Sequence, residues 1–178
     1  MKKILMVFMI AAMCFGLAAC GGSDHYEAED IAAGTAFGSF VSTDLDGNEV
    51  TEAIFAEKDV TILNVWGTYC GPCKEEMPDL AKLSKELPDN AQIVGMVIDV
   101  PEGDADMIAM AKEICKDTNV TFTNILMNDS VEKLLNSVEA IPTTFILDSE
   151  GKTVCAPIVG ADVESYAKAV QEYLAQIE

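Results

Sequence analysis

The feature that most restricts the fold is a pair of cysteines placed between an apolar strand and a helix. Residues Val60–Trp66 (VTILNVW) form a continuous apolar run, which is typical of a strand buried on both faces. A short turn then leads to Cys70 and Cys73, and a helical pattern covers residues 72–87. Two intervening residues let the sulfurs reach disulfide distance across the first helical turn. In this context the Cys-Gly-Pro-Cys segment predicts a redox-active pair.

The position of the pair predicts different roles for its two sulfurs. Cys70 stands at the start of the helix, where unpaired backbone N–H groups and the helix dipole stabilise a thiolate. Because only a thiolate attacks a disulfide, Cys70 is the expected nucleophile. Cys73 lies one turn into the helix, and we expect it to be more buried and to resolve the mixed disulfide.

A zinc site or a purely structural disulfide would use the same two cysteines. A Cys-x-x-Cys zinc site needs a second pair of ligands with similar spacing. Cys115 and Cys155 are far apart in the sequence, and the single histidine, His25, lies outside the expected domain. We therefore expect no metal.

Further apolar runs and helical patterns alternate along the chain, which predicts an α/β fold. The expected strands are residues 92–100, 143–147 and 153–159, and the expected helices are residues 104–118, 131–138 and a last one from Asp162. The dipeptide Asp46-Gly47 lies between two β-rich segments, which predicts a hairpin before the buried strand.

The N-terminus has the pattern of a secretory signal. Lys2 and Lys3 precede a short apolar segment, and the residues Leu-Ala-Ala-Cys that end at Cys20 resemble the lipobox of bacterial lipoproteins. We expect residues 1–19 to be a cleaved signal peptide, residues 20–36 a tether beginning at a lipidated Cys20, and residues 37–178 one domain. The expected location is the extracytoplasmic face of the cell membrane, where disulfides persist.

The charge of the chain excludes some classes of function. Asp and Glu number 30 against 11 Lys and no Arg, so the formal net charge is −19. We therefore expect no binding of nucleic acid through a basic patch. The lack of arginine also disfavours a peroxidase site, which needs one near its cysteine. No G-x-G-x-x-G follows a strand, so we expect no nicotinamide or flavin cofactor.

The segment NVWGTYCGPCKEEMP, with Ile141-Pro142-Thr143 far downstream, resembles the membrane-anchored thioredoxin-like thiol–disulfide oxidoreductases of the TlpA/ResA type. The resemblance covers residues 37–178. It implies a thioredoxin-like fold with a central mixed β-sheet flanked by helices, an N-terminal β-hairpin and a helical insertion. It also implies a cis peptide bond before Pro142, which would lie against the cysteine pair.

The same resemblance implies further site residues. Glu76 takes the place of the family's active-site glutamate and shares a helix face with Cys73. A partly desolvated carboxylate there can accept and return the proton of the redox cycle, whereas the alternative is a solvated surface residue. Asn64 stands where cytosolic thioredoxins carry a buried aspartate, which gives Glu76 more weight. The implied substrate-binding residues are Trp66, Tyr69, Gly71, Pro72, Ile141 and Pro142.

Cys115 and Cys155 remain after the reactive pair. An even number of cysteines outside the cytoplasm favours a second disulfide. Cys115, however, lies on the apolar face of its helix, where a free cysteine packs well. Both alternatives stay open at this level.

These observations predict a thiol–disulfide oxidoreductase that reduces disulfides in exported proteins. By resemblance, its electrons come from a membrane thiol transporter. Its clients would be exported proteins such as apocytochrome c, or a methionine sulfoxide reductase. The alternatives are an oxidase of the same fold and a non-catalytic binding lipoprotein with a structural disulfide.

Overall fold

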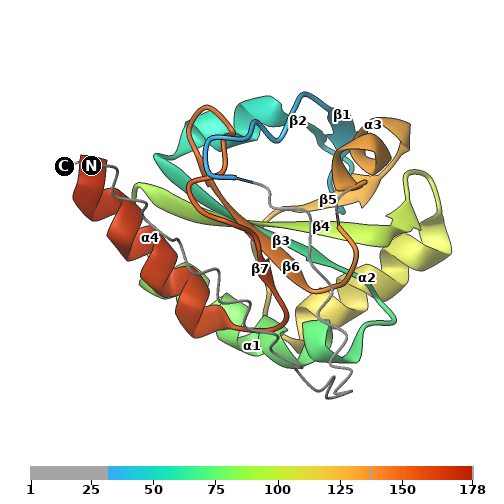
Figure 1. The fold of residues 1–178 in the computed structure, drawn as a ribbon. Coiled ribbons are helices and arrows are strands. Elements are labelled where there is room, and N and C mark those ends of the chain that lie inside the picture. Colours follow the sequence, from blue (N-terminus) through green and yellow to red (C-terminus); the bar gives the residue numbers. More distant parts are fainter. Residues whose placement is uncertain (1–31, 137, 178) are drawn as a thin grey trace, which may run out of the picture.

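A five-stranded mixed sheet forms the centre of the fold (Figure 1). The computed structural model describes residues 32–136 and 138–177. The strands follow the order β5 (Asn124–Met127), β4 (Ala91–Pro101), β3 (Val60–Trp66), β6 (Thr143–Asp148) and β7 (Ile158–Val159). β3, β4 and β5 are parallel, whereas β6 is antiparallel to both of its neighbours. This is the expected thioredoxin-like α/β arrangement.

Both faces of the sheet are covered, which explains the continuous apolar run of β3. All seven residues of β3 are buried. One face carries the helices α1 (Gly71–Glu86), α2 (Ala105–Asp117) and α4 (Val163–Ile177) (Figure 1). The other face carries the hairpin of β1 (Val41–Thr43) and β2 (Glu49–Thr51), the 3-10 helices η1 (Glu52–Glu57) and η2 (Lys133–Leu135), and α3 (Asp129–Glu132).

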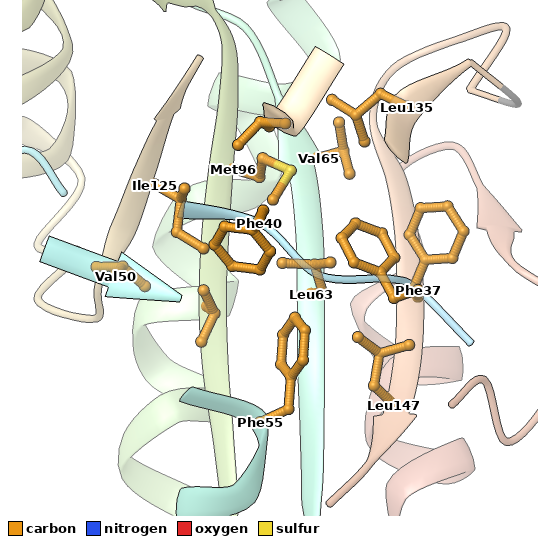
Figure 2. Close-up of a cluster of buried hydrophobic side chains, with 13 residues drawn as sticks. Phe37, Phe40, Val50, Phe55, Leu63, Val65, Met96, Ile125, Leu135 and Leu147 are labelled. Carbon is orange, nitrogen blue, oxygen red and sulfur yellow. The ribbon is translucent and has the colours of Figure 1, made fainter. Parts of the chain in front are cut away.

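Aromatic side chains from the N-terminal part of the domain fill the core on the hairpin face (Figure 2). Phe37 makes edge contacts with Phe55 and Phe145, at centroid distances of 5.9 Å and 5.6 Å. Phe40 and Phe55 pack with Leu63 and other buried residues in the same cluster. Each buried aromatic or aliphatic side chain contributes about 2 kcal/mol to the stability of the fold. The segment from Phe37 to Phe55, which contains the hairpin, is therefore part of the core of the domain.

The hairpin and most helices have local causes in the sequence. The Asp44 carboxylate accepts hydrogen bonds from the backbone N–H groups of Asp46 and Asn48, and Gly47 takes the positive φ of +85° that the turn requires. Asp104 accepts a hydrogen bond from the N–H of Met107 and so caps α2. The hairpin, α1, α2 and α4 confirm the expected elements.

Two expected elements are wrong in extent, and one strand is new. The expected strand over residues 153–159 is reduced to β7, because Thr153 makes only an isolated bridge to Leu147 and the chain then turns before Pro157, which has no N–H to donate. The expected helix over residues 131–138 divides into α3 and η2, and residue 137 lies outside the described residues. β5 was not expected, because a four-residue edge strand has too short a pattern.

The last residues of the expected tether pack against the domain. Gly34 N–H donates to the Thr153 carbonyl, and Ala36 forms a bridge with Lys152. The predicted signal peptide, Cys20 and His25 lie outside the described residues. Across residues 32–136 and 138–177, no helix has the length and apolar character needed to cross a membrane.

Candidate active site

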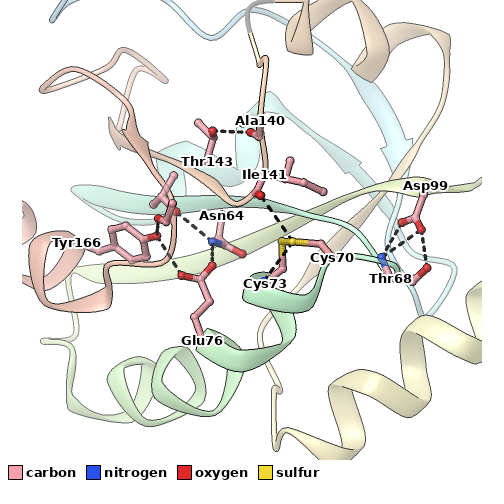
Figure 3. Close-up of a disulfide and its surroundings, with 12 residues drawn as sticks. Asn64, Thr68, Cys70, Cys73, Glu76, Asp99, Ala140, Ile141, Thr143 and Tyr166 are labelled. Carbon is pink, nitrogen blue, oxygen red and sulfur yellow. Dashed lines mark hydrogen bonds between the residues drawn. A yellow bond between two sulfur atoms is a disulfide. The ribbon is translucent and has the colours of Figure 1, made fainter. Parts of the chain in front are cut away.

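Cys70 and Cys73 form a disulfide at the N-terminus of α1 (Figure 3). Cys70 is the residue that caps the helix, and its Sγ accepts a hydrogen bond from the backbone N–H of Cys73 at 3.2 Å. In the reduced protein this donor and the helix dipole would stabilise a Cys70 thiolate. Cys70 is 6% exposed and Cys73 is fully buried, so a partner reaches Cys70 first.

The loop before β6 borders the disulfide. The Ile141–Pro142 peptide bond is cis, as the resemblance implied. The carbonyl oxygen of Ile141 lies 3.7 Å from Cys70 Sγ (Figure 3). Two bonds hold this loop, because Thr143 Oγ1 donates to the Ala140 carbonyl at 2.8 Å and Gly160 N–H donates to the Pro142 carbonyl at 2.8 Å. The Cys70 sulfur therefore faces the backbone of the Ile141–Pro142 loop.

Glu76 is buried behind the disulfide, only 4% exposed. Its Oε1 accepts a hydrogen bond from Asn64 Nδ2 at 2.8 Å, and its Oε2 lies 3.0 Å from the Tyr166 hydroxyl (Figure 3). Burial raises the pKa of the Glu76 carboxyl above its ordinary value, and the two hydrogen bonds offset this only in part. The interpretation of Glu76 as a solvated surface residue is therefore wrong.

Two other residues of the site, Tyr166 and Asp99, could not be predicted from the sequence pattern. Tyr166 lies on the apolar stripe of α4, and that pattern says nothing about a partner for its hydroxyl. Asp99, at the end of β4, accepts hydrogen bonds from both the N–H and the hydroxyl of Thr68, at 2.9 Å and 2.5 Å. Asp99 therefore holds the turn that leads from β3 to Cys70.

The residues expected to bind substrate differ in their exposure to solvent. Tyr69 is 69% exposed beside Cys70, Gly71 and Pro72 are exposed, and Ile141 is half-buried. Pro142 is buried against the site. Trp66 corrects our expectation, because it is buried and its indole N–H donates to Asn124 Oδ1 at 2.9 Å. Trp66 packs in the buried cluster beneath Cys70 and Cys73 and does not face an incoming chain.

The structure does not bring Cys115 and Cys155 together. Both thiols are free. Cys115 packs in the cluster under α2, and Cys155 packs in the cluster against α4. Burial raises the pKa of Cys115 to about 11, which leaves little thiolate at neutral pH. Within the described ranges, no group of His, Cys, Asp and Glu could hold a metal ion.

Comparison with known proteins agrees with this geometry. Residues 33–155, more than half of the chain, match the model of the AhpC/TSA family. The chain belongs to the AhpC/TSA family. Within it, the chain is 30% identical over 159 residues to the thiol-disulfide oxidoreductase ResA of Bacillus subtilis, covering 86% of both chains. It is 29% identical over 183 residues to a ResA of Bacillus cereus, covering 99% of both chains.

A solved structure supports the fold of this AhpC/TSA member. The thioredoxin domain of a thiol-disulfide oxidoreductase from Bacteroides vulgatus superposes with a TM-score of 0.65 at 24% identity, covering 80% of this chain and 97% of that chain. Together with the ResA relatives and the Cys70–Cys73 pair, this makes the protein a thioredoxin-like thiol–disulfide oxidoreductase of the ResA type.

Proposed function

We propose that this oxidoreductase reduces disulfides in exported proteins at the extracytoplasmic face of the cell membrane. The observation that carries the proposal is the arrangement of Cys70 at the N-terminus of α1 with Glu76 buried behind the pair. The N-terminus of the helix favours a thiolate on Cys70, and the buried carboxyl supplies a proton acceptor close to the more deeply buried Cys73.

The reaction transfers two electrons from the dithiol to a substrate disulfide. The Cys70 thiolate attacks one substrate sulfur, the substrate S–S bond breaks, and the other substrate sulfur leaves as a thiolate and is protonated by water. Cys73 then passes its proton to the Glu76 carboxylate, and the Cys73 thiolate attacks Cys70 Sγ. The mixed disulfide breaks, the second substrate sulfur takes up the proton from Glu76, and the Cys70–Cys73 disulfide remains.

The exposed surface beside Cys70 supports a polypeptide substrate. Tyr69, Gly71 and Pro72 present a surface next to the sulfur, and the Ile141–Pro142 loop offers backbone to pair with. Exported proteins with cysteine pairs, such as apocytochrome c, or a methionine sulfoxide reductase, fit this description. The electrons would come from a membrane protein that transports thiol equivalents, because the proposed cycle uses no bound cofactor.

Reduction of insulin by the dithiol form tests the catalytic part of the proposal. The wild-type protein should precipitate the insulin B chain in the presence of a reductant, and Cys70→Ser should reduce that rate to the background. Equal rates in both proteins would refute catalysis by this pair. A reduction potential as high as that of the strong thiol oxidants would instead identify an oxidase.

Two further experiments test location and clients. Cys20→Ala should release the protein from the membrane fraction of cells, and retention of the variant would contradict the lipid anchor. Cys73→Ser leaves the mixed disulfide unresolved, so it should accumulate covalent complexes with client proteins, whereas Cys70→Ser should not. Mass spectrometry of those complexes identifies the clients.

A further inference from the structure

The hydroxyl of Tyr166 contacts Glu76 (Figure 3) and also two groups of the segment 160–162. Tyr166 is fully buried on α4. Its oxygen lies 3.0 Å from Glu76 Oε2 and 2.7 Å from the carbonyl oxygen of Gly160, and it accepts a hydrogen bond from the backbone N–H of Asp162 at 3.2 Å. Gly160 in turn binds the carbonyl of Pro142 through its N–H. The hydroxyl therefore connects Glu76 with the loop that borders the disulfide.

A phenol has one hydrogen, so it cannot donate to Glu76 and to Gly160 at the same time. Burial raises the pKa of Tyr166 to about 12, so the hydroxyl keeps its hydrogen throughout the working range of pH. What changes is the direction in which that hydrogen points. The charge of Glu76 decides the direction, because an ionised carboxylate needs a donor and a protonated one can itself donate.

The two states of Glu76 give two complete hydrogen-bond patterns. When Glu76 carries a proton on Oε2, it donates to the Tyr166 oxygen, and Tyr166 donates to Gly160. When Glu76 is ionised, Tyr166 turns its hydrogen to Oε2 and releases the Gly160 carbonyl. Asn64 Nδ2 donates to Oε1 in both states, so Oε2 is the oxygen that gains and loses the proton.

We propose that Tyr166 is a positioning residue that places the exchangeable proton of Glu76 on Oε2. Through the same hydroxyl, the charge of Glu76 determines whether Tyr166 donates its hydrogen bond to the Gly160 carbonyl. This rests on the proposed role of Glu76 as the proton acceptor for Cys73. During resolution the Cys73 proton moves to Glu76, the new sulfur–sulfur bond forms, and Tyr166 turns back to Gly160. Tyr166 therefore binds the Gly160 carbonyl for as long as Glu76 carries that proton, and releases it when the proton passes to the departing substrate sulfur.

The groups around this network are mostly neutral. Asn64 and Thr144 contribute an amide and a hydroxyl from β3 and β6. Cys73 is the neighbouring ionisable group on α1. The carboxylate of Asp162 is exposed and binds the hydroxyl of Ser165. Cys73 and Tyr166 are therefore the titratable side chains nearest to Glu76 among these groups.

A carbon-13 NMR titration of the Glu76 carboxyl in the oxidised full-length protein tests the proposal. Glu76→Gln assigns the resonance, and Tyr173→Phe, on the same helix, is the matched control. Because Tyr166 donates to the ionised carboxylate, Tyr166→Phe should move the Glu76 midpoint to higher pH, and Tyr173→Phe should leave it unchanged. An unchanged midpoint in Tyr166→Phe would overturn the proposal.

A second NMR measurement needs no variant and so does not depend on the folding of one. In the wild-type protein the Cζ resonance of Tyr166 should shift with the same midpoint as the Glu76 carboxyl, because the hydroxyl changes its acceptor at that point. A Tyr166 resonance that stays constant through the Glu76 titration would overturn the proposal.

The rate of resolution connects the titration with the reaction. In Tyr166→Phe, the resolution of a mixed disulfide should be roughly two- to tenfold slower at neutral pH, with its acid limb shifted upward, while the attack of Cys70 keeps its rate. An equal loss at every pH would indicate a purely structural role and refute the proposal. If insulin is not reduced at all, the proposed function fails, whereas the two titrations still decide the role of Tyr166.

Discussion

The Asn64 amide on the central strand donates a 2.8 Å hydrogen bond to the Glu76 carboxyl on the first helix. The same amide nitrogen donates to Thr144 Oγ1 on β6 at 3.0 Å. Asn64 therefore supplies two donors, whereas an ionised aspartate at this position would supply only acceptors. With a neutral amide at this position, Glu76 is the one fully buried carboxyl group among residues 32–136 and 138–177.

Replacement of Asn64 by Asp should be strongly destabilising. It would place a second carboxyl group against Glu76 and remove the donor to Thr144, at a cost of about 3 kcal/mol in the free energy of unfolding. The loss should be larger at pH 8 than at pH 5, because two ionised carboxylates repel each other. Urea unfolding at both pH values measures it.

The matched control for this substitution is Asn90→Asp. Asn90 also donates to a carboxylate, Asp59, at 2.9 Å, but this pair is exposed to solvent. Its effect should stay below about 1 kcal/mol. A similar loss of stability at both positions would show that burial beside Glu76 is not the cause.

Glu76→Gln should change how the stability depends on pH. The folded protein raises the pKa of Glu76, so it binds this proton more tightly than the unfolded chain does. The resulting stabilisation is present at low pH and is lost as the pH rises through the folded-state pKa. The difference in free energy of unfolding between Glu76→Gln and wild type should therefore grow with pH in favour of glutamine.

The same variant should slow the resolution of a mixed disulfide by on the order of 10²-fold, because the proton acceptor is lost. Stopped-flow release of a chromogenic thiol measures this rate. Glu75→Gln, at the exposed neighbouring position, should leave both the rate and the pH dependence unchanged. A wild-type rate in Glu76→Gln would exclude Glu76 from proton transfer.

Gly95→Ala should destabilise the buried contact between Asn124 and Trp66 beneath the cysteine pair. A Cβ at Gly95 would overlap the Asn124 side chain, which holds the Trp66 indole and binds the Phe122 carbonyl at 2.9 Å. Because Asn124 is buried and bonded at both ends, it cannot move aside without loss. We expect a loss of about 3 kcal/mol in the free energy of unfolding. Gly71→Ala, where the added carbon meets open space, is the control, and equal losses would contradict the prediction.

Thr68→Val should weaken the turn before Cys70. The substitution keeps the shape but removes the hydroxyl that binds Asp99, which should lower the free energy of unfolding by about 1–2 kcal/mol. Thr121→Val, at an exposed position, should have little effect in the same denaturation experiment. A neutral Thr68→Val would show that the backbone bond to Asp99 is sufficient.

The oxidised protein should contain free thiols at Cys115 and Cys155. Alkylation after unfolding, followed by peptide mass spectrometry, should label both residues and leave Cys70 and Cys73 linked to each other. In the folded protein Cys115 should react slowly, because its pKa of about 11 leaves little thiolate at neutral pH. A peptide pair crosslinked through Cys115 and Cys155 would contradict the structure.

Elements whose causes are local could be predicted from the sequence. The run Val60–Trp66 followed by Cys70-Gly-Pro-Cys73 identifies the central strand and the helix that starts at the reactive cysteine. Asp46-Gly47 and Asp104 predicted a hairpin and a helix start, because turns and caps depend on residues only a few positions apart. Short elements at the edge of the sheet, such as β5 and β7, were missed or overextended, because their pattern is brief and their pairing is distant.

The tertiary structure alone decided what surrounds the cysteine pair. Glu76, Asn64 and Tyr166 meet from α1, β3 and α4, and the Tyr166–Glu76 contact joins residues that are 90 positions apart. The same packing buried Trp66 and kept Cys115 and Cys155 in separate clusters. Residue types and spacing identify a reactive pair, because its chemistry is local to one helical turn. The proton acceptor depends on burial and hydrogen bonds, which exist only after distant segments have packed together.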